Sequence, residues 1–267
     1  MRPTFAGHHR PGSLCGSESS QIGRTVARSH QSTQLRAAPF FAFNLRQRDE
    51  WIADQAAAIP AGARVLDVGA GACRYRPLFA HCDYKTHDFK QLTATDVGWG
   101  GYGAIDYVSD ICAIPVADAS FDAILCAEVL EHVPNPISAL GEMARILNRG
   151  GTLLLTAPQR SGAHQAPHHY YGGFTPSWYK TFLPEHGLTL VSITPNGGLF
   201  RAYGEETQRV ALLLASATRF PPLPLGRLLR AVLKASASAV ALASEWLDRY
   251  DKEKTFTVGY HVVATRM

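Results

Sequence analysis

The fold of this chain is decided by one stretch, Val65-Leu66-Asp67-Val68-Gly69-Ala70-Gly71-Ala72-Cys73. A short apolar run, typical of a buried strand, leads into a glycine-rich turn, and the turn is predicted to open a helix around residues 74–80. Glycine allows positive φ and a close approach of the backbone to a ligand. The stretch therefore predicts a strand followed by a turn that can bind a ligand, although an ordinary tight turn has the same pattern.

Two common phosphate-binding turns do not match this pattern. A dinucleotide fingerprint needs a third glycine where this chain has Arg74, and no G-K-S/T follows for a P-loop. Asp67, at the end of the strand, would repel phosphates and suits a ligand with a cationic end. A nicotinamide-dependent oxidoreductase is therefore disfavoured.

Strand-like and helix-like segments alternate along the rest of the chain. Strands are predicted over residues 64–68, 84–88, 106–108, 121–127, 152–157, 188–194 and 256–265. One predicted helix has its apolar face at Leu140, Met143, Ala144 and Leu147, and residues 148–151 are expected to end it with a glycine cap. The alternation predicts a doubly wound α/β sheet with helices on both faces.

Acidic residues follow several of these strands. Asp88 lies 21 residues after Asp67, at the end of the second strand, where an acidic side chain can bind ribose hydroxyls. Asp110 and Ile111 follow the third strand, and Glu128 follows the fourth. The carboxyl ends of parallel strands meet at one edge, so these residues are expected to share a crevice.

This order of motifs resembles the class I S-adenosylmethionine-dependent methyltransferases, in the group related to the ubiquinone and menaquinone biosynthesis enzymes. The resemblance covers about residues 60–195 and the last strand. It implies a Rossmann-like, seven-stranded sheet with an antiparallel last strand, S-adenosyl-L-methionine as cofactor, and methyl transfer to a small-molecule or lipid-like acceptor.

The resemblance also implies a role for each matching residue. Asp67, Gly69 and Gly71 would bind the methionine end of the cofactor. Asp88 would bind the ribose, and Asp110 with Ile111 would hold the adenine. Ala127 and Glu128 would line the pocket near the sulfonium. The chain departs from the family at Cys73, where a third glycine is usual, and at His87, which precedes Asp88 in place of a small residue.

Three histidines are candidates for catalysis: His132, His164 and His168. A hydroxyl acceptor needs a base such as histidine, whereas an amine or a stabilised carbanion does not. For His164 and His168, the alternative is that the side chains only anchor the loop before the helix that begins at Pro176. For His132, and for Glu131 beside it, the alternative is a plain helix-start residue. No metal site is predicted, because Pro167 argues against a helix here and no cysteine or carboxylate lies near enough in the sequence.

Residues 199–255 form an apolar insertion before the last strand, with two helical stretches separated by prolines at 221–224. One stretch carries an apolar face of Leu225, Leu228, Leu229, Val232 and Leu233 beside Arg227, Arg230 and Lys234. This pattern predicts either packing on the domain or on a second copy, or a lid that makes peripheral membrane contact through residues 225–234. The oligomeric state is left open.

The composition and charge limit the remaining possibilities. Of the 267 residues, 46% are hydrophobic, which is enough for a sizeable core and excludes a largely disordered or fibrous protein. Residues 1–48 hold seven arginines and one acidic residue, so the other 219 residues carry 19 basic and 21 acidic side chains. The basic character belongs to the N-terminal segment, and no nucleic-acid partner is predicted.

We therefore expect a disordered basic tail over residues 1–38 and a methyltransferase domain over residues 39–267. A targeting segment or a mis-assigned start would have the same tail composition. Five cysteines form no C-x-x-C pair, which predicts reduced thiols and a cytoplasmic location. The competing function is a catalytically silent scaffold or assembly factor of the same fold, against which the intact residues Asp67, Gly69, Gly71 and Asp110 argue.

Overall fold

The computed structural model describes residues 43–98, 100–217 and 224–267. Within these ranges the elements are α2 (Phe43–Ala58), β1 (Arg64–Val68), the 3-10 helix η2 (Arg76–Phe79), β2 (Asp83–Asp88), α3 (Ala94–Val97), β3 (Tyr107–Val108), β4 (Phe121–Ala127), η3 (Leu130–His132), α4 (Pro136–Ile146), β5 (Leu147–Pro158), α5 (Pro176–Glu185), β6 (Leu188–Pro195), α6 (Leu199–Ala217), α7 (Pro224–Leu247), η4 (Asp248–Tyr250) and β7 (Gly259–Arg266). The expected tail over residues 1–38 and the domain start at residue 39 lie outside the described residues, so that division stays a prediction.

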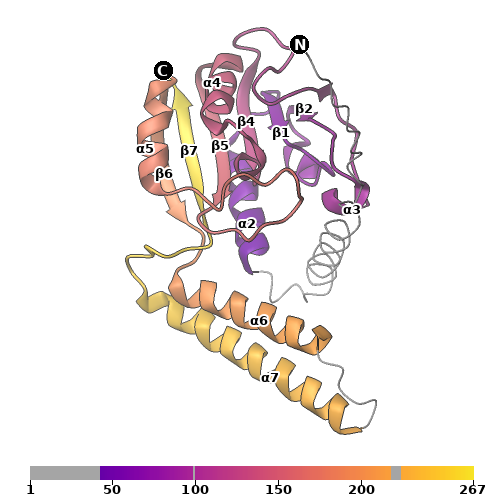
Figure 1. Ribbon diagram of the computed structural model, residues 1–267. Coiled ribbons are helices and arrows are strands. Elements are labelled where there is room, and N and C mark those ends of the chain that lie inside the picture. The colour runs from indigo at the N-terminus through magenta and orange to yellow at the C-terminus, as the bar shows by residue number, and fades with distance from the viewer. Residues whose placement is uncertain (1–42, 99, 218–223) are drawn as a thin grey trace, which may run out of the picture.

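The described residues form a seven-stranded sheet in the order β3-β2-β1-β4-β5-β7-β6 (Figure 1). Strands β1 to β5 pair in parallel, and β7 runs antiparallel to both β5 and β6. β7 lies between two other strands, so its residues 259–262 are buried. The predicted doubly wound fold with an antiparallel last strand is confirmed.

Helices cover both faces of the sheet, as the alternating pattern predicts. On one face, α4 and α5 bury Leu140 and Tyr179; on the other, α2 buries Ile52. Consecutive residues of β4 point to opposite faces, so Ile124 belongs to the first core and Leu125 to the second. Both are fully buried, which explains why the strand is continuously apolar.

Two local predictions around the helices were wrong. The helix after β4 ends at Ile146, before the glycines that were expected to cap it, because Leu147 is already extended and pairs with Phe121 of β4. The helix expected over residues 74–80 is only the single-turn η2, which has Pro77 in its first turn. Pairing across the sheet outweighs the local helix signal in the first case.

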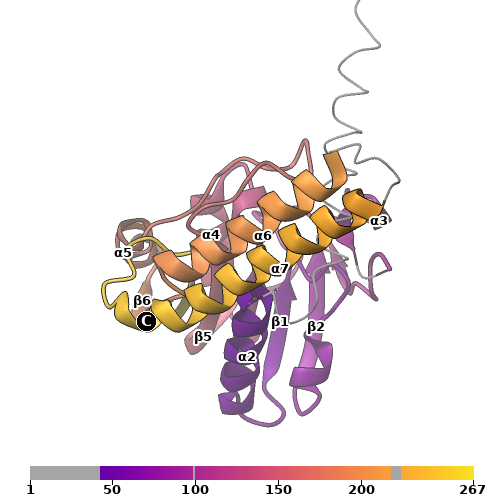
Figure 2. The same ribbon diagram turned by 90° about the horizontal axis from the view of Figure 1, so that it is seen from below.

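The insertion before β7 is a helical hairpin, as expected from its two apolar stretches. α6 and α7 run antiparallel beneath the carboxyl edge of the parallel strands, and both are in front when the molecule is seen from below (Figures 1 and 2). The helices approach closely at Gly204, where an added Cβ would lie 3.0 Å from Cβ of Ser244 and 3.2 Å from Cα of Ala241. Among the helices of the described ranges, none has the length and apolar character needed to cross a membrane.

The base of the hairpin is fixed by two buried or half-buried aspartates that cap α6. Asp248 accepts hydrogen bonds from the backbone N–H of Gly198 at 3.0 Å and of Arg201 at 3.1 Å. Asp251 accepts one from the N–H of Leu199 at 2.7 Å. These carboxylates satisfy N–H groups that the first turn of a helix leaves without partners, so the hairpin has a defined start.

Acid is expected to destabilise the fold through His261. Its ring is buried, stacks on Trp51 with ring centroids 4.9 Å apart, and has a pKa lowered to about 4 by burial. The neutral ring therefore stabilises the fold above pH 6.5, its ordinary pKa, and this stabilisation is lost as the pH falls toward 4. Between pH 7 and pH 5, His261 should account for a loss of about 2 kcal/mol in the free energy of unfolding. Urea unfolding at both pH values should show a loss about 2 kcal/mol smaller in His261→Phe than in the wild type. An equal loss in both would contradict the assignment to His261.

Candidate active site

The turn after β1 has the backbone conformation that its glycines predict. Gly69 has φ +72° and Gly71 has φ +52°, both in the region that favours glycine. The N–H groups of Gly69 and Ala70 both donate to the carbonyl oxygen of His87 at 2.9 Å, so the turn is fixed to the end of β2. A Cβ on Gly69 would lie 2.4 Å from Cγ2 of Val129. A side chain is therefore excluded here by both conformation and space.

Cys73 occupies the position where the family usually has a third glycine, and the structure shows why glycine suits it. The residue has φ +56°, which is uncommon for a side chain other than glycine. Its thiol packs against Gly103, where an added Cβ would lie 2.6 Å from Sγ. Cys73 thus adopts a left-handed backbone conformation that glycine would adopt without strain.

The Asp88 carboxylate joins the glycine turn to the end of β2. It is buried, and its Oδ2 accepts a hydrogen bond from the N–H of Gly71 at 3.0 Å, while Oδ1 accepts one from the N–H of Lys90 at 2.9 Å. Each carboxylate oxygen has a second acceptor position, so Asp88 can hold the turn and still accept hydroxyl groups.

Asp67, the last residue but one of β1, is a buried carboxyl group only 2% exposed. The hydroxyl of Tyr84 on the neighbouring strand β2 donates a hydrogen bond to it. Burial, with Asp88 as a further contribution, raises the pKa of Asp67 to about 7, against the effect of the Tyr84 hydrogen bond. The group is thus close to half-protonated at neutral pH, and a cation bound beside it would favour the charged form.

Asp110 and Ile111 follow β3 at the same edge of the sheet. Asp110 is exposed, and its Oδ1 accepts a hydrogen bond from the N–H of Cys112 at 2.8 Å. Ile111 is 8% exposed and belongs to the larger core. An exposed carboxylate beside an apolar side chain fits the predicted contacts to the adenine ring. Asp110 would contact the edge of the ring and Ile111 its face.

The end of β4 holds Ala127 and a strained Glu128. Glu128 has φ +56°, and strained residues of this kind cluster at functional sites. Its Oε1 accepts a hydrogen bond from the Thr156 hydroxyl at 2.8 Å, and its Oε2 lies 3.1 Å from Nη1 of Arg48. The carboxylate is therefore held between β5 and α2.

Three histidine rings meet beside this strand end. The rings of His132 and His164 lie 4.7 Å apart, and His169 lies 5.6 Å from His132 and 4.7 Å from His164. The ring of His168 packs instead on Phe89, with centroids 5.2 Å apart. Two of the three candidate histidines are thus brought together, and His169 takes the place expected for His168.

His132 has a defined protonation state. Its Nδ1 lies 2.5 Å from the carbonyl oxygen of His168, so Nδ1 carries the hydrogen and Nε2 is left as the acceptor. Burial, with His164 and His169 as further contributions, lowers the pKa of His132 to about 4. The ring is therefore neutral at pH 7 and can accept a proton at Nε2.

Glu131 lies next to this ring and was expected only to start a helix. It is 2% exposed, its Oε1 lies 3.8 Å from Nε2 of His132, and its Oε2 has no hydrogen-bond partner. Burial, and then the nearby Glu128, raise its pKa well above the ordinary value. Across the described ranges of the chain, no group of three or more histidine, cysteine or acidic side chains is arranged to hold a metal ion.

A comparison with known proteins finds a family that resembles this chain over the strands and the glycine turn. A family model described as a methyltransferase domain matches residues 66–155, which span β1 to β5 and so include the glycine turn, Asp88 and Glu128. The matched residues thus include both the glycine turn and the parallel strands of the sheet. This part of the chain is therefore similar to the methyltransferase domain family.

Curated relatives of this chain come from the group that the motifs indicate. A ubiquinone biosynthesis O-methyltransferase of Xanthomonas oryzae is 36% identical over 118 residues, covering 39% of this chain and 46% of that enzyme. A demethylmenaquinone methyltransferase of Renibacterium salmoninarum is 37% identical over 107 residues, covering 39% of this chain and 44% of that enzyme. The chain thus spans about half the length of these relatives.

Solved structures share the fold of this chain at low identity. The 4+2 cyclase SpnF superposes with a TM-score of 0.54 at 17% identity, covering 96% of this chain and 99% of that one. A sarcosine dimethylglycine methyltransferase, so assigned in Galdieria sulphuraria, gives 0.51 at 16% identity, covering 82% and 84%. One of the two is named as a cyclase, so the shared fold by itself does not fix the reaction.

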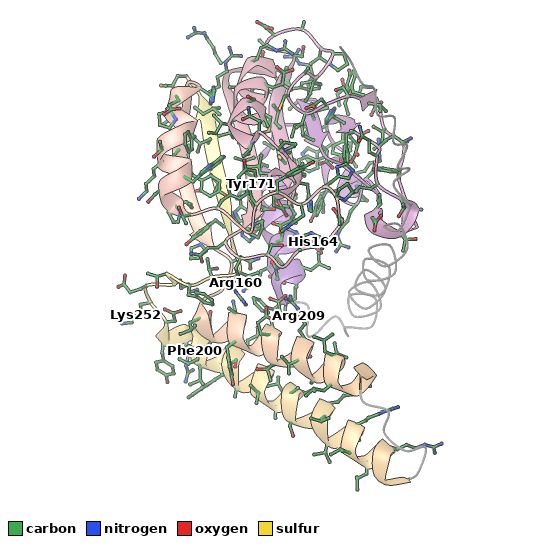
Figure 3. The ribbon with its side chains drawn as sticks, in the orientation of Figure 1. Arg160, His164, Tyr171, Phe200, Arg209 and Lys252 are labelled. Atoms are coloured by element: carbon green, nitrogen blue, oxygen red, sulfur yellow. The ribbon has the colours of Figure 1, made fainter. Side chains whose placement is uncertain are left out.

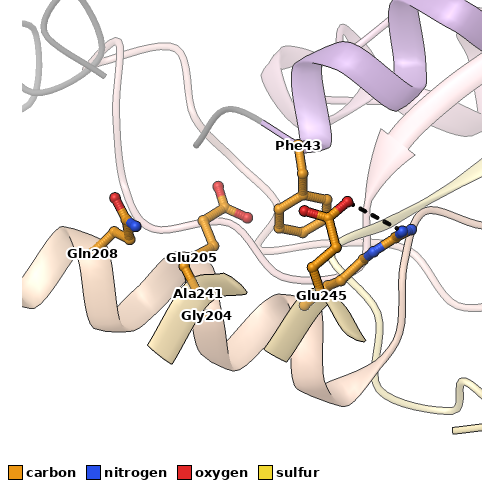
Figure 4. A pocket seen from close by; sticks show the side chains of 7 residues that line it. Phe43, Gly204, Glu205, Gln208, Ala241 and Glu245 are labelled. Atoms are coloured by element: carbon orange, nitrogen blue, oxygen red, sulfur yellow. Dashed lines mark hydrogen bonds and ion pairs between the residues drawn. The ribbon is translucent and has the colours of Figure 1, made fainter. Parts of the chain in front are cut away.

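The hairpin of α6 and α7 contacts the carboxyl edge of the sheet through charged side chains. Figure 3 shows Arg160, after β5, and Arg209, on α6. Both pair with Glu206 of α6, at 3.2 and 3.0 Å. A cavity of about 20 Å³ lies behind them, between the start of α2 and the hairpin, and is lined by Phe43, Arg201, Gly204, Glu205, Gln208, Ala241 and Glu245 (Figure 4). It is large enough only for about one water molecule.

Sequence reasoning missed Arg48, Tyr84, Glu131 and His169. Arg48 lies 80 residues from Glu128 in a helix that carried no motif, and Tyr84 differs little from other strand residues. Glu131 and His169 sat beside residues that had been singled out, so the E-H pair at 131–132 and the H-H pair at 168–169 were the available signals.

Proposed function

We propose that this protein transfers a methyl group from S-adenosyl-L-methionine to an oxygen of a small or lipid-like hydroxylated acceptor. The observation that carries the proposal is the position of neutral His132 at the end of β4, the strand that pairs with the one that leads into the glycine turn. A cofactor loop and a proton acceptor thus occupy the same edge of the sheet, where ligands of such folds bind.

The residues present fit the cofactor. The glycine turn is open to a close backbone approach, and buried Asp67 suits the cationic methionine end. Asp88 would accept the ribose hydroxyls, Asp110 and Ile111 would contact the adenine, and Glu128 would lie near the sulfonium. When bound, the cofactor supplies a methyl group on a positively charged sulfur, which departs with the electrons of the carbon–sulfur bond.

The acceptor side is assigned to His132. Its Nε2 takes the proton that a hydroxyl loses as its oxygen attacks the methyl carbon, while the His168 carbonyl holds Nδ1–H and keeps the ring in this tautomer. The name of the Xanthomonas relative, an O-methyltransferase, favours oxygen as the acceptor atom. His164 and His168 stay as further predicted catalytic residues.

Calorimetric titration of S-adenosylmethionine and S-adenosylhomocysteine tests the proposal. We expect micromolar binding, about −8 kcal/mol, at pH 8. Affinity should fall by up to about tenfold per pH unit below pH 7, because Asp67 with its pKa of about 7 must lose its proton to face a cation. Asp67→Asn should bind weakly at both pH 8 and pH 6. No binding by the folded wild type would contradict the proposal and favour the silent scaffold.

A further inference from the structure

The outer side of α7 carries an apolar stripe that the described part of the chain leaves exposed. Four large side chains form it: Leu228 (60% exposed), Val232 (51%), Leu242 (49%) and Trp246 (54%). Ala235 and Ala239, between them, are also exposed. The spacing of 4, 7, 11, 14 and 18 residues keeps all six on one side of the helix, over about 27 Å.

The opposite side of α7 is the one that packs on the protein. Gly226, Ala237 and Ser244 are buried, and Ser244 lies against Gly204 of α6. α6 lies between α7 and the sheet in Figure 1, so the stripe faces away from the sheet. An amphipathic helix normally turns its apolar side inward, so this one has an outward apolar side that the fold does not use.

The charges beside the stripe are of one sign from Leu228 to Leu242. Residues 210–244 contain four basic side chains and no acidic one, whereas the base of the hairpin carries Glu205, Glu206, Glu245, Asp248 and Asp251. Arg227 and Lys234 are exposed and flank the stripe. At its other end, the guanidinium of Arg249 lies 4.0 Å from the ring centroid of Trp246, and Tyr250 packs beside it. Tryptophan, tyrosine and arginine in this combination are typical of the boundary between water and lipid.

We propose that α7 docks flat on an anionic phospholipid bilayer through Leu228, Val232, Leu242 and Trp246. Its apolar stripe enters the headgroup region and its flanking basic side chains contact lipid phosphates, as in interfacial amphipathic helices. A second copy is a poorer occupant, because a symmetric contact through α7 would bring two strongly positive segments together. Docking would turn the carboxyl edge of the sheet toward the bilayer and a lipid-like acceptor; that last step alone rests on the proposed function.

Sedimentation of the full chain with vesicles tests the docking without any methyl donor. The protein should pellet with phosphatidylcholine vesicles that contain phosphatidylglycerol and far less with phosphatidylcholine alone. Arg227→Gln with Lys234→Gln should lower the partition coefficient about 25-fold, or about fivefold per charge. Leu228→Ser with Val232→Ser should lower it at least about tenfold. The matched controls, Lys180→Gln and Val191→Ser, change an exposed lysine of α5 and a 61% exposed valine of β6, and should bind as the wild type does.

The stripe itself is located by fluorescence. Brominated lipid in anionic vesicles should quench tryptophan emission of the wild type, and Trp246→Phe should remove most of that quenching. The proposal is overturned if the wild type does not pellet with anionic vesicles, or if the control variants lose as much binding as the α7 variants. It is also overturned if quenching persists in Trp246→Phe, or if Leu228→Ser with Val232→Ser dissociates a dimer in solution, which would assign the stripe to a second copy.

Discussion

Replacing His132 with glutamine is expected to lower kcat by about 10²–10⁴-fold, the usual effect of losing a positioned general base. Glutamine can still donate to the His168 carbonyl, but it has no nitrogen that accepts a proton. Cofactor affinity should be unchanged, because the glycine turn is held by His87 and Asp88 rather than by His132. Steady-state transfer to a simple catechol, with calorimetry of the cofactor, separates the two effects.

His81→Gln is the matched control for that variant. His81 also holds a backbone carbonyl through its ring, with Nε2 3.1 Å from the oxygen of Ile59, but it lies between η2 and β2 at the other end of the sheet. This variant should keep the wild-type kcat. If His132→Gln were as active as His81→Gln, the acceptor would not need a base at this position, as an amine or a stabilised carbanion does not.

Gly69→Ala is expected to weaken cofactor binding by about 100-fold. The methyl group would have to occupy space 2.4 Å from Cγ2 of Val129, a branched side chain with little rotamer freedom, and to do so at φ +72°. Overpacking and the left-handed conformation each destabilise the present loop conformation by about 1–3 kcal/mol. The loop can relieve this strain only by adopting another conformation. Binding would then have to restore the present one. Titration of S-adenosylhomocysteine measures the loss.

Gly62→Ala separates conformation from space. Gly62 also has a left-handed φ, +78°, but an added Cβ would meet nothing within 4 Å. We expect this variant to lower the free energy of unfolding by about 1 kcal/mol and to bind the cofactor as the wild type does. Equal affinity in Gly69→Ala and Gly62→Ala would show that the turn after β1 does not hold the ligand.

Much of the fold could be predicted because its signals are local. Apolar runs of strand length, the glycines after Val68 and the acids at the ends of the first four strands are set by neighbours in the sequence. Boundaries that depend on partners were less accurate: Leu147 carries a helix-face pattern, yet it pairs with Phe121 and ends the helix early. Local propensities are weaker than a buried strand pairing, so such positions are decided by tertiary structure.

The sequence by itself determined the sheet, the glycine turn after β1 and the amphipathic pattern of the insertion, because periodicity and turn chemistry need only nearby residues. Only the tertiary structure decided that Arg48 pairs with Glu128, that His169 rather than His168 joins the ring cluster, and that the stripe on α7 faces outward. These outcomes depend on contacts between residues far apart in the chain and on which side of a helix its neighbours cover. Burial then sets the chemistry, since it lowers the pKa of His132 and raises that of Asp67.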